Sequence, residues 1–282
     1  MIDLFKVSVV IPVYNSAEYL VKAVESAVHL DEVGEILLVE DKSPDNALEI
    51  CRHLVEKYPI VKLLQHPNGE NKGPAESRNI GMKNATCDYI SFLDSDDYYL
   101  ENRFFTAKRV FKEQPDADGV YDAIGFFKGS SDFYKLYTIN KPIDPDCLFH
   151  FLLRGTFGHF STNGITLKKK LIQKVGYFDP KLKQHEDSEL WLRFAFFGKL
   201  YPGNLKEPVA LARMHDKNTS INADAVSKLQ YAEAIIARFK KEKVSFVNRL
   251  LIRHKYAKAM AELRQSLYLK ELLFSFLRKY IK

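Results

Sequence analysis

The sequence predicts an α/β fold in which a doubly wound, mixed but mostly parallel sheet is flanked by helices and followed by a helical C-terminal tail. Three observations support this prediction. Short apolar, β-branched runs alternate with segments of helical periodicity over the first hundred residues. Polar and acidic residues follow these runs, where the strands of such a sheet end. From about residue 223 onward the chain contains neither Pro nor Gly.

The first hundred residues contain the most regular alternation. Strands are expected at residues 7–13, 35–39, 60–64 and 89–93. Helices are expected at residues 17–28, from Ser43 up to the third strand, and at residues 74–84. Ser43 is a suitable N-cap, and Pro44 suits the first position of a helix.

The pattern is looser beyond residue 100. Strands are expected at residues 120–127 and 133–139. Helices are expected at residues 102–111, 148–153, 169–175 and 186–197, and the composition is helical from about residue 223. A chain of 282 residues is long enough to bury a sizeable core without disulfides or structural metals.

Charge and cysteine content exclude several classes of protein. Residues 238–282 carry 13 Lys and Arg against 3 Asp and Glu, whereas residues 1–237 carry 29 against 33. The basic character therefore belongs to the tail, and nucleic acid is not expected as a partner of the main part. The three cysteines, Cys51, Cys87 and Cys147, match neither a disulfide framework nor a zinc site.

Hydropathy favours a cytoplasmic protein. No apolar run approaches the roughly 20 residues that a membrane-spanning helix needs. The first apolar run follows an acidic residue, Asp3, instead of a basic leader, and it is interpreted as a buried strand and not as a signal peptide.

Acidic residues stand where other nucleotide-binding folds have glycines. The chain lacks both Gly-x-Gly-x-x-Gly after its first strand and Gly-x-x-x-x-Gly-Lys-Ser/Thr, which argues against dinucleotide hydride transfer and P-loop ATPases. Instead, Asp94, Ser95, Asp96 and Asp97 follow the fourth strand. Two carboxylates two residues apart can share a Mg²⁺ or Mn²⁺ ion. The alternative is that these aspartates cap the helix after Leu100.

Six segments together carry a resemblance to a known family. They are VSVVIPVYN at 7–15, Asp41 after the second strand, NKGPAESRN at 71–79, DSDD at 94–97, GYFDPKLKQHED at 176–187 and RMHDKNTS at 213–220. In order and spacing they resemble the family 2 glycosyltransferases, nucleotide-sugar enzymes of the GT-A fold. The resemblance implies a GT-A domain at 1–221, with a nucleotide-sugar half at 1–100 and an acceptor half at 101–221. Residues 222–282 would form a basic helical extension.

The resemblance also assigns the donor site. It implies that Pro12, Tyr14 and Asp41 hold the nucleoside, with Tyr14 stacking on the base and Asp41 accepting a hydrogen bond from uracil. Arg78 would neutralise phosphate charge, or alternatively form a structural ion pair. One departure concerns the turn after the second strand, where Lys42 replaces the family's usual glycine.

Metal and catalytic residues follow from the same resemblance. Asp94 and Asp96 match the family's Asp-x-Asp motif and would hold the cation, with Ser95 in the same donor-binding turn. His215 matches a late histidine that approaches the metal or phosphate.

Asp187, the second acid of Glu186-Asp187, matches the general base of the family, and Trp191 would line the acceptor side. The alternative is that Glu186 and Asp187 only stabilise the helix, because acidic side chains in the first turn interact favourably with the helix dipole.

These assignments predict an inverting, metal-dependent glycosyltransferase. The donor would be a nucleotide sugar, by family expectation a UDP-sugar, and the cation Mn²⁺ or Mg²⁺. The acceptor would be a saccharide or a lipid-linked glycan in surface polysaccharide or glycolipid synthesis. A nucleotidyltransferase of similar fold and a non-catalytic sugar-nucleotide-binding module are the alternatives.

The tail has an amphipathic pattern. Its apolar residues include Leu263, Leu267, Leu273 and Leu277, and basic residues lie among its polar positions. Such a helix can lie in the anionic interface at the inner face of the membrane. The alternatives are that it packs on the enzyme's own body or on a second subunit.

Overall fold

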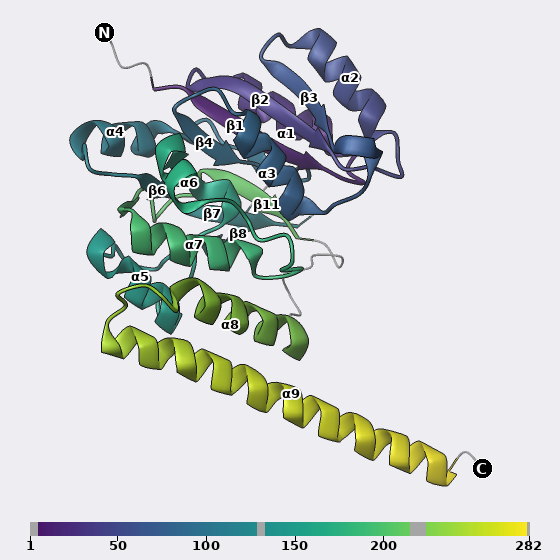
Figure 1. Ribbon diagram of the computed structural model, residues 1–282. Coiled ribbons are helices and arrows are strands. Elements are labelled where there is room, and N and C mark those ends of the chain that lie inside the picture. Colours follow the sequence, from purple (N-terminus) through teal and green to yellow (C-terminus); the bar gives the residue numbers. More distant parts are fainter. Residues whose placement is uncertain (1–4, 129–132, 215–223, 281–282) are drawn as a thin grey trace. The chain divides into compact units, whose positions relative to one another are not determined.

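The computed structural model of the chain describes residues 5–128, 133–214 and 224–280 (Figure 1). The side chains of residues 133, 134, 267 and 269–280 lie outside this description. The chain forms two compact units. The first comprises Met1–Pro180 and Leu190–Asp216, and the second comprises Lys181–Glu189 and Lys217–Lys282.

A seven-stranded sheet is the centre of the first unit. Its strands, in spatial order, are β10 (Leu200–Pro202), β6 (Gly119–Tyr121), β9 (Ile165–Lys168), β4 (Tyr89–Phe92), β1 (Val7–Val13), β2 (Val33–Glu40) and β3 (Val61–Gln65). Only β9 runs antiparallel to its neighbours. The central strand β1 is paired on both sides, with Val10 opposite Leu37 of β2 and Phe92 of β4.

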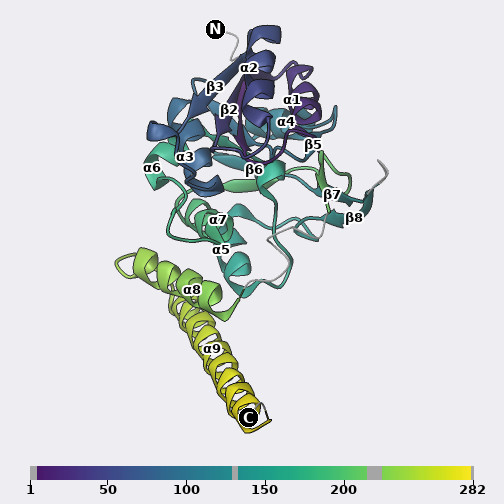
Figure 2. The same ribbon diagram turned by 90° about the vertical axis from the view of Figure 1, so that its right-hand side faces the viewer.

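Helices cover both faces of this sheet (Figure 2). They are α1 (Leu20–Val28), α2 (Ala47–Lys57), α3 (Pro74–Asn84), α4 (Phe105–Glu113), α5 (Pro145–Arg154) and α6 (Lys169–Val175). Val9 and Ile11 of β1 join the core cluster that contains residues of α1, α2 and α4. Val10 points to the other face, where a side chain at Gly81 of α3 would overlap it. The alternation along β1 therefore gives each face its own core, and the doubly wound sheet predicted from the sequence is confirmed.

A second, four-stranded sheet corrects one prediction. Its strands are β5 (Tyr98–Tyr99), β11 (Ala210–Arg213), β7 (Ile124–Phe127) and β8 (Phe133–Tyr137). The single strand expected at residues 120–127 is wrong, because β6 and β7 belong to different sheets. Between them, Asp122 is fully buried, and its carboxylate accepts a hydrogen bond from the Asn204 N–H at 2.6 Å. This contact lies where the chain leaves the first sheet.

The start of the second helix also differs from expectation. The second helix begins at Ala47 with Asn46 at its N-cap, so neither Ser43 nor Pro44 starts it. The Ser43 hydroxyl instead accepts a hydrogen bond from the Asn15 N–H at 3.3 Å, which joins the loops that follow β1 and β2. The remaining elements of the first unit are the short helices η1 (Pro67–Gly69) and η2 (Thr162–Gly164). Helix α7 (Glu186–Phe197) crosses the boundary between the two units.

The second unit contains a helical hairpin. Helices α8 (Ala225–Phe239) and α9 (Phe246–Tyr280) pack side by side and run in opposite directions (Figure 1). The predicted helical tail is thus two helices joined by residues 240–245. The Arg249 side chain donates to the carbonyl oxygens of Val244 (3.0 Å) and Glu242 (3.1 Å), which satisfies main-chain groups of this turn. Within the described residues, no helix is both long and apolar enough to cross a membrane.

A buried glutamate joins the strands at the start of β2. The Glu35 Oε1 atom accepts hydrogen bonds from Ser8 Oγ (2.6 Å), Thr86 N (2.5 Å) and Thr86 Oγ1 (2.8 Å). Its Oε2 atom lies 2.7 Å from Lys62 Nζ. Burial by itself would raise the pKa of Glu35, but the hydrogen bonds from Lys62, Ser8 and Thr86 outweigh it and lower the pKa to about 2.

Replacement of Glu35 by Gln should therefore make stability less dependent on pH. The pKa of Glu35 in the folded state lies below the value of about 4.3 in an unfolded chain, so its stabilisation is complete above about pH 5 and is lost as the pH falls toward 2. We expect Glu35→Gln to lower the free energy of unfolding at pH 7 by about 2–3 kcal/mol. Urea unfolding between pH 3 and pH 7 measures this. Glu49→Gln, at an exposed site on α2, is the control and should change it by under about 0.5 kcal/mol; equal slopes in all three proteins would contradict the assignment.

Candidate functional site

The carboxyl ends of the parallel strands bring the polar motifs to one edge of the large sheet. The segments after β1, β2 and β4 lie at this edge because these strands are parallel. Strand β9 is antiparallel and therefore begins there, so the preceding helix η2 lies at the same edge. Residues near 14, 41, 94–97 and 163 are brought to this edge by topology.

Asp97 connects three segments at this edge. The Asn163 Nδ2 group of η2 donates to Asp97 Oδ2 at 2.5 Å, and the Arg213 N–H at the end of β11 donates to Asp97 Oδ1 at 2.7 Å. The Asn163 Oδ1 atom also accepts from the Asp94 N–H at 3.0 Å. Burial raises the pKa of Asp97 well above its usual value, and the like charges of Asp96 and Asp94 raise it further. Asp97 therefore holds the turn, and α4 has Phe104 at its N-cap with no side-chain cap hydrogen bond.

Asp94 is paired with Arg78. The Arg78 Nη2 atom, on α3, lies 2.6 Å from Asp94 Oδ1. The Arg78 side chain is 8% exposed and its guanidinium carbon lies 5.6 Å from the centre of the Phe178 ring. Of the two roles expected for Arg78, the ion pair is therefore present in the structure. Ser95 is buried next to Asp94, and Asp96 is partly exposed.

The aspartates of this turn fit a hard divalent cation. Carboxylate oxygens are the ligands that Mg²⁺ and Mn²⁺ prefer. Asp94 and Asp96 are two residues apart in this turn, and both side chains are partly exposed. In the described part of the chain, no group of three His, Cys, Asp or Glu side chains is arranged to hold a metal. His215, the third predicted ligand, lies outside the described residues.

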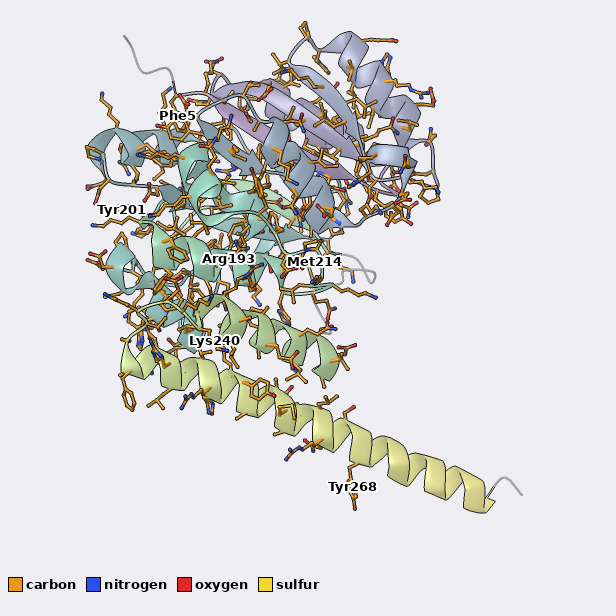
Figure 3. The ribbon with its side chains drawn as sticks, viewed as in Figure 1. Phe5, Arg193, Tyr201, Met214, Lys240 and Tyr268 are labelled. Carbon is orange, nitrogen blue, oxygen red and sulfur yellow. The ribbon has the colours of Figure 1, made fainter. Side chains whose placement is uncertain are left out.

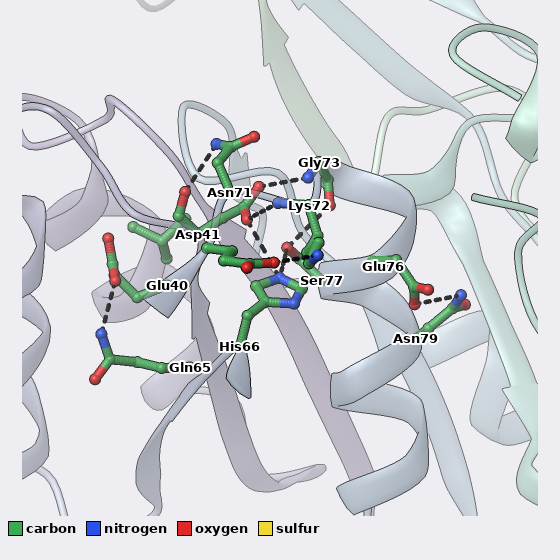
Figure 4. Close-up of polar contacts among 12 residues, drawn as sticks. Glu40, Asp41, Gln65, His66, Asn71, Lys72, Gly73, Glu76, Ser77 and Asn79 are labelled. Carbon is green, nitrogen blue, oxygen red and sulfur yellow. Dashed lines mark hydrogen bonds and ion pairs between the residues drawn. The ribbon is translucent and has the colours of Figure 1, made fainter. Parts of the chain in front are cut away.

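Asp41 organises the loop before α3 (Figure 4). Its carboxylate accepts hydrogen bonds from the main-chain N–H groups of Lys72 (2.6 Å) and Gly73 (2.8 Å). The His66 Nε2 atom lies 3.3 Å from Asp41 Oδ1 and 2.9 Å from Ser77 Oγ. Asp41 is only 2% exposed. In this structure its carboxylate therefore binds main-chain groups of the protein's own loop, where the sequence predicted a hydrogen bond from uracil.

The loops beside Asp41 contain the other residues expected to hold the nucleoside. Tyr14 is 52% exposed, directly after β1, and Pro12 is partly exposed near the end of that strand. Asn15 and Lys42 have φ values of 51° and 56°, in the left-handed region. The glycine that the family usually has in place of Lys42 would adopt this conformation at lower cost.

Asp187 belongs to the second compact unit, in the segment Lys181–Glu189. It is partly exposed in the first turn of α7, and His185 just before it has a φ of 62°. A non-glycine residue in this region is uncommon and is found most often at turns and functional sites.

Helix α8 supports this segment through two contacts. The His185 and Tyr231 rings lie with centroids 5.1 Å apart, and the fully buried Glu189 lies 3.4 Å from Arg238 Nε. Desolvation raises the pKa of the Tyr231 phenol, and the nearby carboxylates of Asp187 and Glu189 raise it further. The acid expected to be the general base is therefore held next to α8.

The expectation for Trp191 is wrong. Its side chain is 1% exposed and lies among the rings of Phe160, Phe178 and Phe194, with centroids 5.6–6.0 Å away. It forms part of the core, because the first unit buries this side of α7. Arg193, one turn of α7 away from Glu189, donates to the carbonyl oxygens of Val175 (3.1 Å) and Tyr177 (2.6 Å) (Figure 3).

Sequence reasoning missed three residues that position the site: Asn163, His66 and Asn79. The Asn79 side chain donates to the Phe178 carbonyl at 3.0 Å and accepts from the Phe178 N–H at 2.9 Å, which attaches the 176–178 segment to α3. The polar run Ser161-Thr162-Asn163-Gly164 before an apolar strand was a signal for Asn163. For His66, the only feature of the sequence that indicated a role was its position directly after an expected strand.

Comparisons with known proteins agree on one family. The model of a family described as glycosyl transferase family 2 matches residues 8–176. An uncharacterized glycosyltransferase of Haemophilus influenzae is 29% identical over 245 residues, which cover 86% of this chain and 90% of that protein. The minor teichoic acid biosynthesis protein GgaB of Bacillus subtilis is 29% identical over 252 residues, 86% of this chain but 26% of GgaB.

Solved structures show the same fold. Residues 1–349 of S. aureus TarS in complex with UDP-GlcNAc match with a TM-score of 0.68 at 18% identity, over 90% of this chain and 72% of that one. The mannosyltransferase PcManGT of Pyrobaculum calidifontis, in complex with GDP-Man and Mn²⁺, matches with a TM-score of 0.58 at 15% identity, over 98% of this chain and 81% of that one. The chain therefore has the predicted GT-A fold.

Loss of the Asn163 side chain should loosen the turn at residues 94–97. We expect Asn163→Ala to lower the free energy of unfolding by about 1–3 kcal/mol, because a buried carboxylate oxygen of Asp97 and the Asp94 N–H lose their partner. Urea unfolding measures the change. Asn84→Ala, at an exposed position of α3, removes a similar amide and should change stability by under about 0.5 kcal/mol. Equal effects of the two substitutions would contradict this role of Asn163.

Proposed function

The chain belongs to glycosyl transferase family 2 and is a glycosyltransferase, and from this premise we propose that it transfers a sugar from a nucleoside diphosphate donor with inversion at the anomeric carbon. The observation that carries the proposal is the turn Asp94–Asp97. Its buried Asp97 is fixed by Asn163 and Arg213, while Asp94 and Asp96 remain partly exposed at the carboxyl edge of the sheet.

The donor nucleotide is proposed to bind along the segments after β1, β2 and β4. The exposed ring of Tyr14 is suited to stack on a base, with Pro12 beside it. Asp41 supports this part of the site through residues 72 and 73, which its carboxylate holds by their main-chain N–H groups. A UDP-sugar is the proposed donor, which agrees with the complex of TarS with UDP-GlcNAc.

The diphosphate is proposed to lie near Asp94, Ser95 and Asp96. Asp94 and Asp96 would hold Mn²⁺ or Mg²⁺, with His215 as a further ligand. When bound, the cation would offset the charge that develops on the departing nucleoside diphosphate. The guanidinium of Arg78, 2.6 Å from Asp94, adds a fixed positive charge beside the same group.

Asp187 is proposed as the general base. It would accept the proton of an acceptor hydroxyl while that oxygen forms a bond to the anomeric carbon. The bond between this carbon and the β-phosphate oxygen breaks in the same displacement, and the nucleoside diphosphate leaves from the opposite face. The acceptor is proposed to be a saccharide or a lipid-linked glycan of surface polysaccharide synthesis, the setting that the name of GgaB suggests.

The metal assignment predicts the behaviour of an Asp96 variant. Asp96→Ala should abolish Mn²⁺-dependent binding of UDP-sugars while circular dichroism stays unchanged, because it removes a proposed ligand oxygen from a partly exposed side chain. Calorimetry with and without a chelator measures the binding. Asp31→Ala, an exposed acid elsewhere in the first unit, is the control and should bind as the native protein does. Unchanged affinity of Asp96→Ala under both conditions would rule out this metal site.

The base assignment predicts a separation of chemistry from binding. Asp187→Asn keeps the size of the side chain but cannot take up a proton, so the turnover number should fall by about 10²–10⁴-fold. Donor affinity should change little, since the proposed base acts on the acceptor. Release of UDP from a donor–acceptor pair measures turnover, and calorimetry measures donor binding.

Glu186→Gln is the matched control for Asp187→Asn. Adjacent residues of a helix point about 100° apart, so this variant should lose much less activity. Near-native turnover of Asp187→Asn together with loss of activity in Glu186→Gln would show that the neighbouring acid is the base. Release of pyrophosphate in place of UDP would contradict the glycosyl-transfer mechanism itself.

A further inference from the structure

Large apolar side chains are exposed at the start of α9. Phe246, Val247 and Leu250 are 74%, 55% and 48% exposed, whereas Ile252 and Ala259 on the same helix are buried. At about 100° per residue, Phe246 and Leu250 lie on the side of the helix opposite to Ile252 and Ala259. Helix α9 therefore has two apolar sides, of which one is buried and the other faces solvent.

Basic residues surround the exposed apolar group. Residues 238–255 contain seven Lys and Arg and a single Glu. Lys240, Lys241 and Lys243 are exposed in the turn that precedes α9, where Figure 3 shows Lys240. Arg253 is exposed within about 60° of Leu250 around the helix. The exposed apolar residues thus have exposed basic residues on either side of them along the chain.

The same side of α9 continues toward its C-terminus. Arg264 is exposed on it, and Tyr268, which is 60% exposed, points away from the helix in Figure 3. Two acids lie nearby: Glu242 is partly exposed among the turn lysines, and Glu262 is turned to α8, where its carboxylate lies 2.7 Å from Lys228 Nζ. We name this surface the outer face of α9: the exposed side from Phe246 to Tyr268 together with the preceding lysines.

We propose that the outer face of α9 docks on an anionic lipid bilayer. Exposed apolar residues gathered on one side mark interaction surfaces, and a helix with aromatic and aliphatic residues among Lys and Arg is suited to the headgroup region of a membrane. Phe246, Val247 and Leu250 would enter the boundary between headgroups and acyl chains. The turn lysines and Arg253 would lie at the negatively charged lipid phosphates.

Other partners fit this surface less well. Nucleic acid would attract the lysines, but it offers no apolar phase to Val247 and Leu250. A second copy of the chain would cover the apolar residues, but a symmetric contact would bring the two sets of turn lysines close together. A lipid surface meets both requirements, because it presents negative charge above an apolar layer.

Docking of this kind deepens the proposed function without depending on its donor or metal assignments. A lipid-linked acceptor is held in a bilayer, so an enzyme that lies on the bilayer meets it there. Because docking needs neither donor nor cation, it is measured with the full chain alone. If the protein does not bind vesicles, the proposed sugar transfer is unaffected. If the predictions on donor binding or turnover are wrong, membrane docking is still tested by its own experiment.

Vesicle co-sedimentation tests the proposal. The full-length protein is mixed with vesicles of phosphatidylcholine alone or of equal parts phosphatidylcholine and phosphatidylglycerol. We expect binding to the anionic vesicles, and weakening as NaCl rises from 0.05 to 0.5 M. The triple variant Lys240→Gln, Lys241→Gln, Lys243→Gln should bind about 100-fold more weakly at low salt, because each lysine near the surface contributes to the attraction. Phe246→Ser with Leu250→Ser should weaken binding at least about tenfold.

Matched controls come from the first unit. Phe105→Ser removes an aromatic ring that is 63% exposed on α4, and Arg109→Gln, Lys112→Gln, Lys170→Gln removes three exposed charges. Both should bind vesicles as the native protein does, and circular dichroism verifies the fold of all variants. Equal partition of the native and triple-variant proteins would overturn the proposal. Two other results, each in the absence of vesicle binding, would also overturn it. One is binding to duplex DNA that survives loss of the Phe246 and Leu250 side chains. The other is a concentration-dependent dimer that these substitutions abolish.

Discussion

A buried carboxylate, Asp97 in the turn between β4 and β5, is the constraint on which the candidate site depends. Removal of a carboxylate from water is unfavourable unless hydrogen bonds replace those it loses. Asp97 obtains them from the Asn163 side chain and the Arg213 main chain, so three distant segments must meet before this charge is satisfied. Burial raises the pKa of Asp97, and the nearby carboxylates of Asp96 and Asp94 raise it further.

A second buried charge joins the strands behind that edge. Arg103 is fully buried and donates to Ser91 Oγ (2.5 Å) and to the Ile165 carbonyl (2.9 Å), with Asp122 Oδ2 3.7 Å away. Burial raises the pKa of Asp122 to about 6, although the positive charge of Arg103 opposes this. Such a pair contributes little net stability, but removal of one partner is strongly destabilising. It links β4, β9 and the segment after β6, where the chain leaves the large sheet.

The C-terminal helices and the proposed catalytic acid belong to the same compact unit. Glu189 is buried against Arg238, and His185 lies on the ring of Tyr231. These contacts hold the turn in which His185 takes a left-handed conformation, just before Asp187 in the first turn of α7. Helix α8 thus contacts the segment that precedes α7, while α9 carries an exposed apolar and basic face. Helix α8 therefore makes contacts within the protein, whereas the exposed side of α9 is available to a partner.

The sequence by itself determined the alternation of strands and helices in the first hundred residues, because each depends on local periodicity. It also determined which acids follow which strands, and the order of motifs that identified the family. Only the tertiary structure decided how those acids are used. Asp41 holds residues 72 and 73, and the partners of Asp97 lie 66 and 116 residues away along the chain. Residues 120–127, which have the local pattern of one strand, divide between two sheets because the buried Asp122 finds its partners in distant segments. Local pattern reports the conformation that each segment favours, whereas the partner of a buried polar group depends on which segments the whole fold brings together.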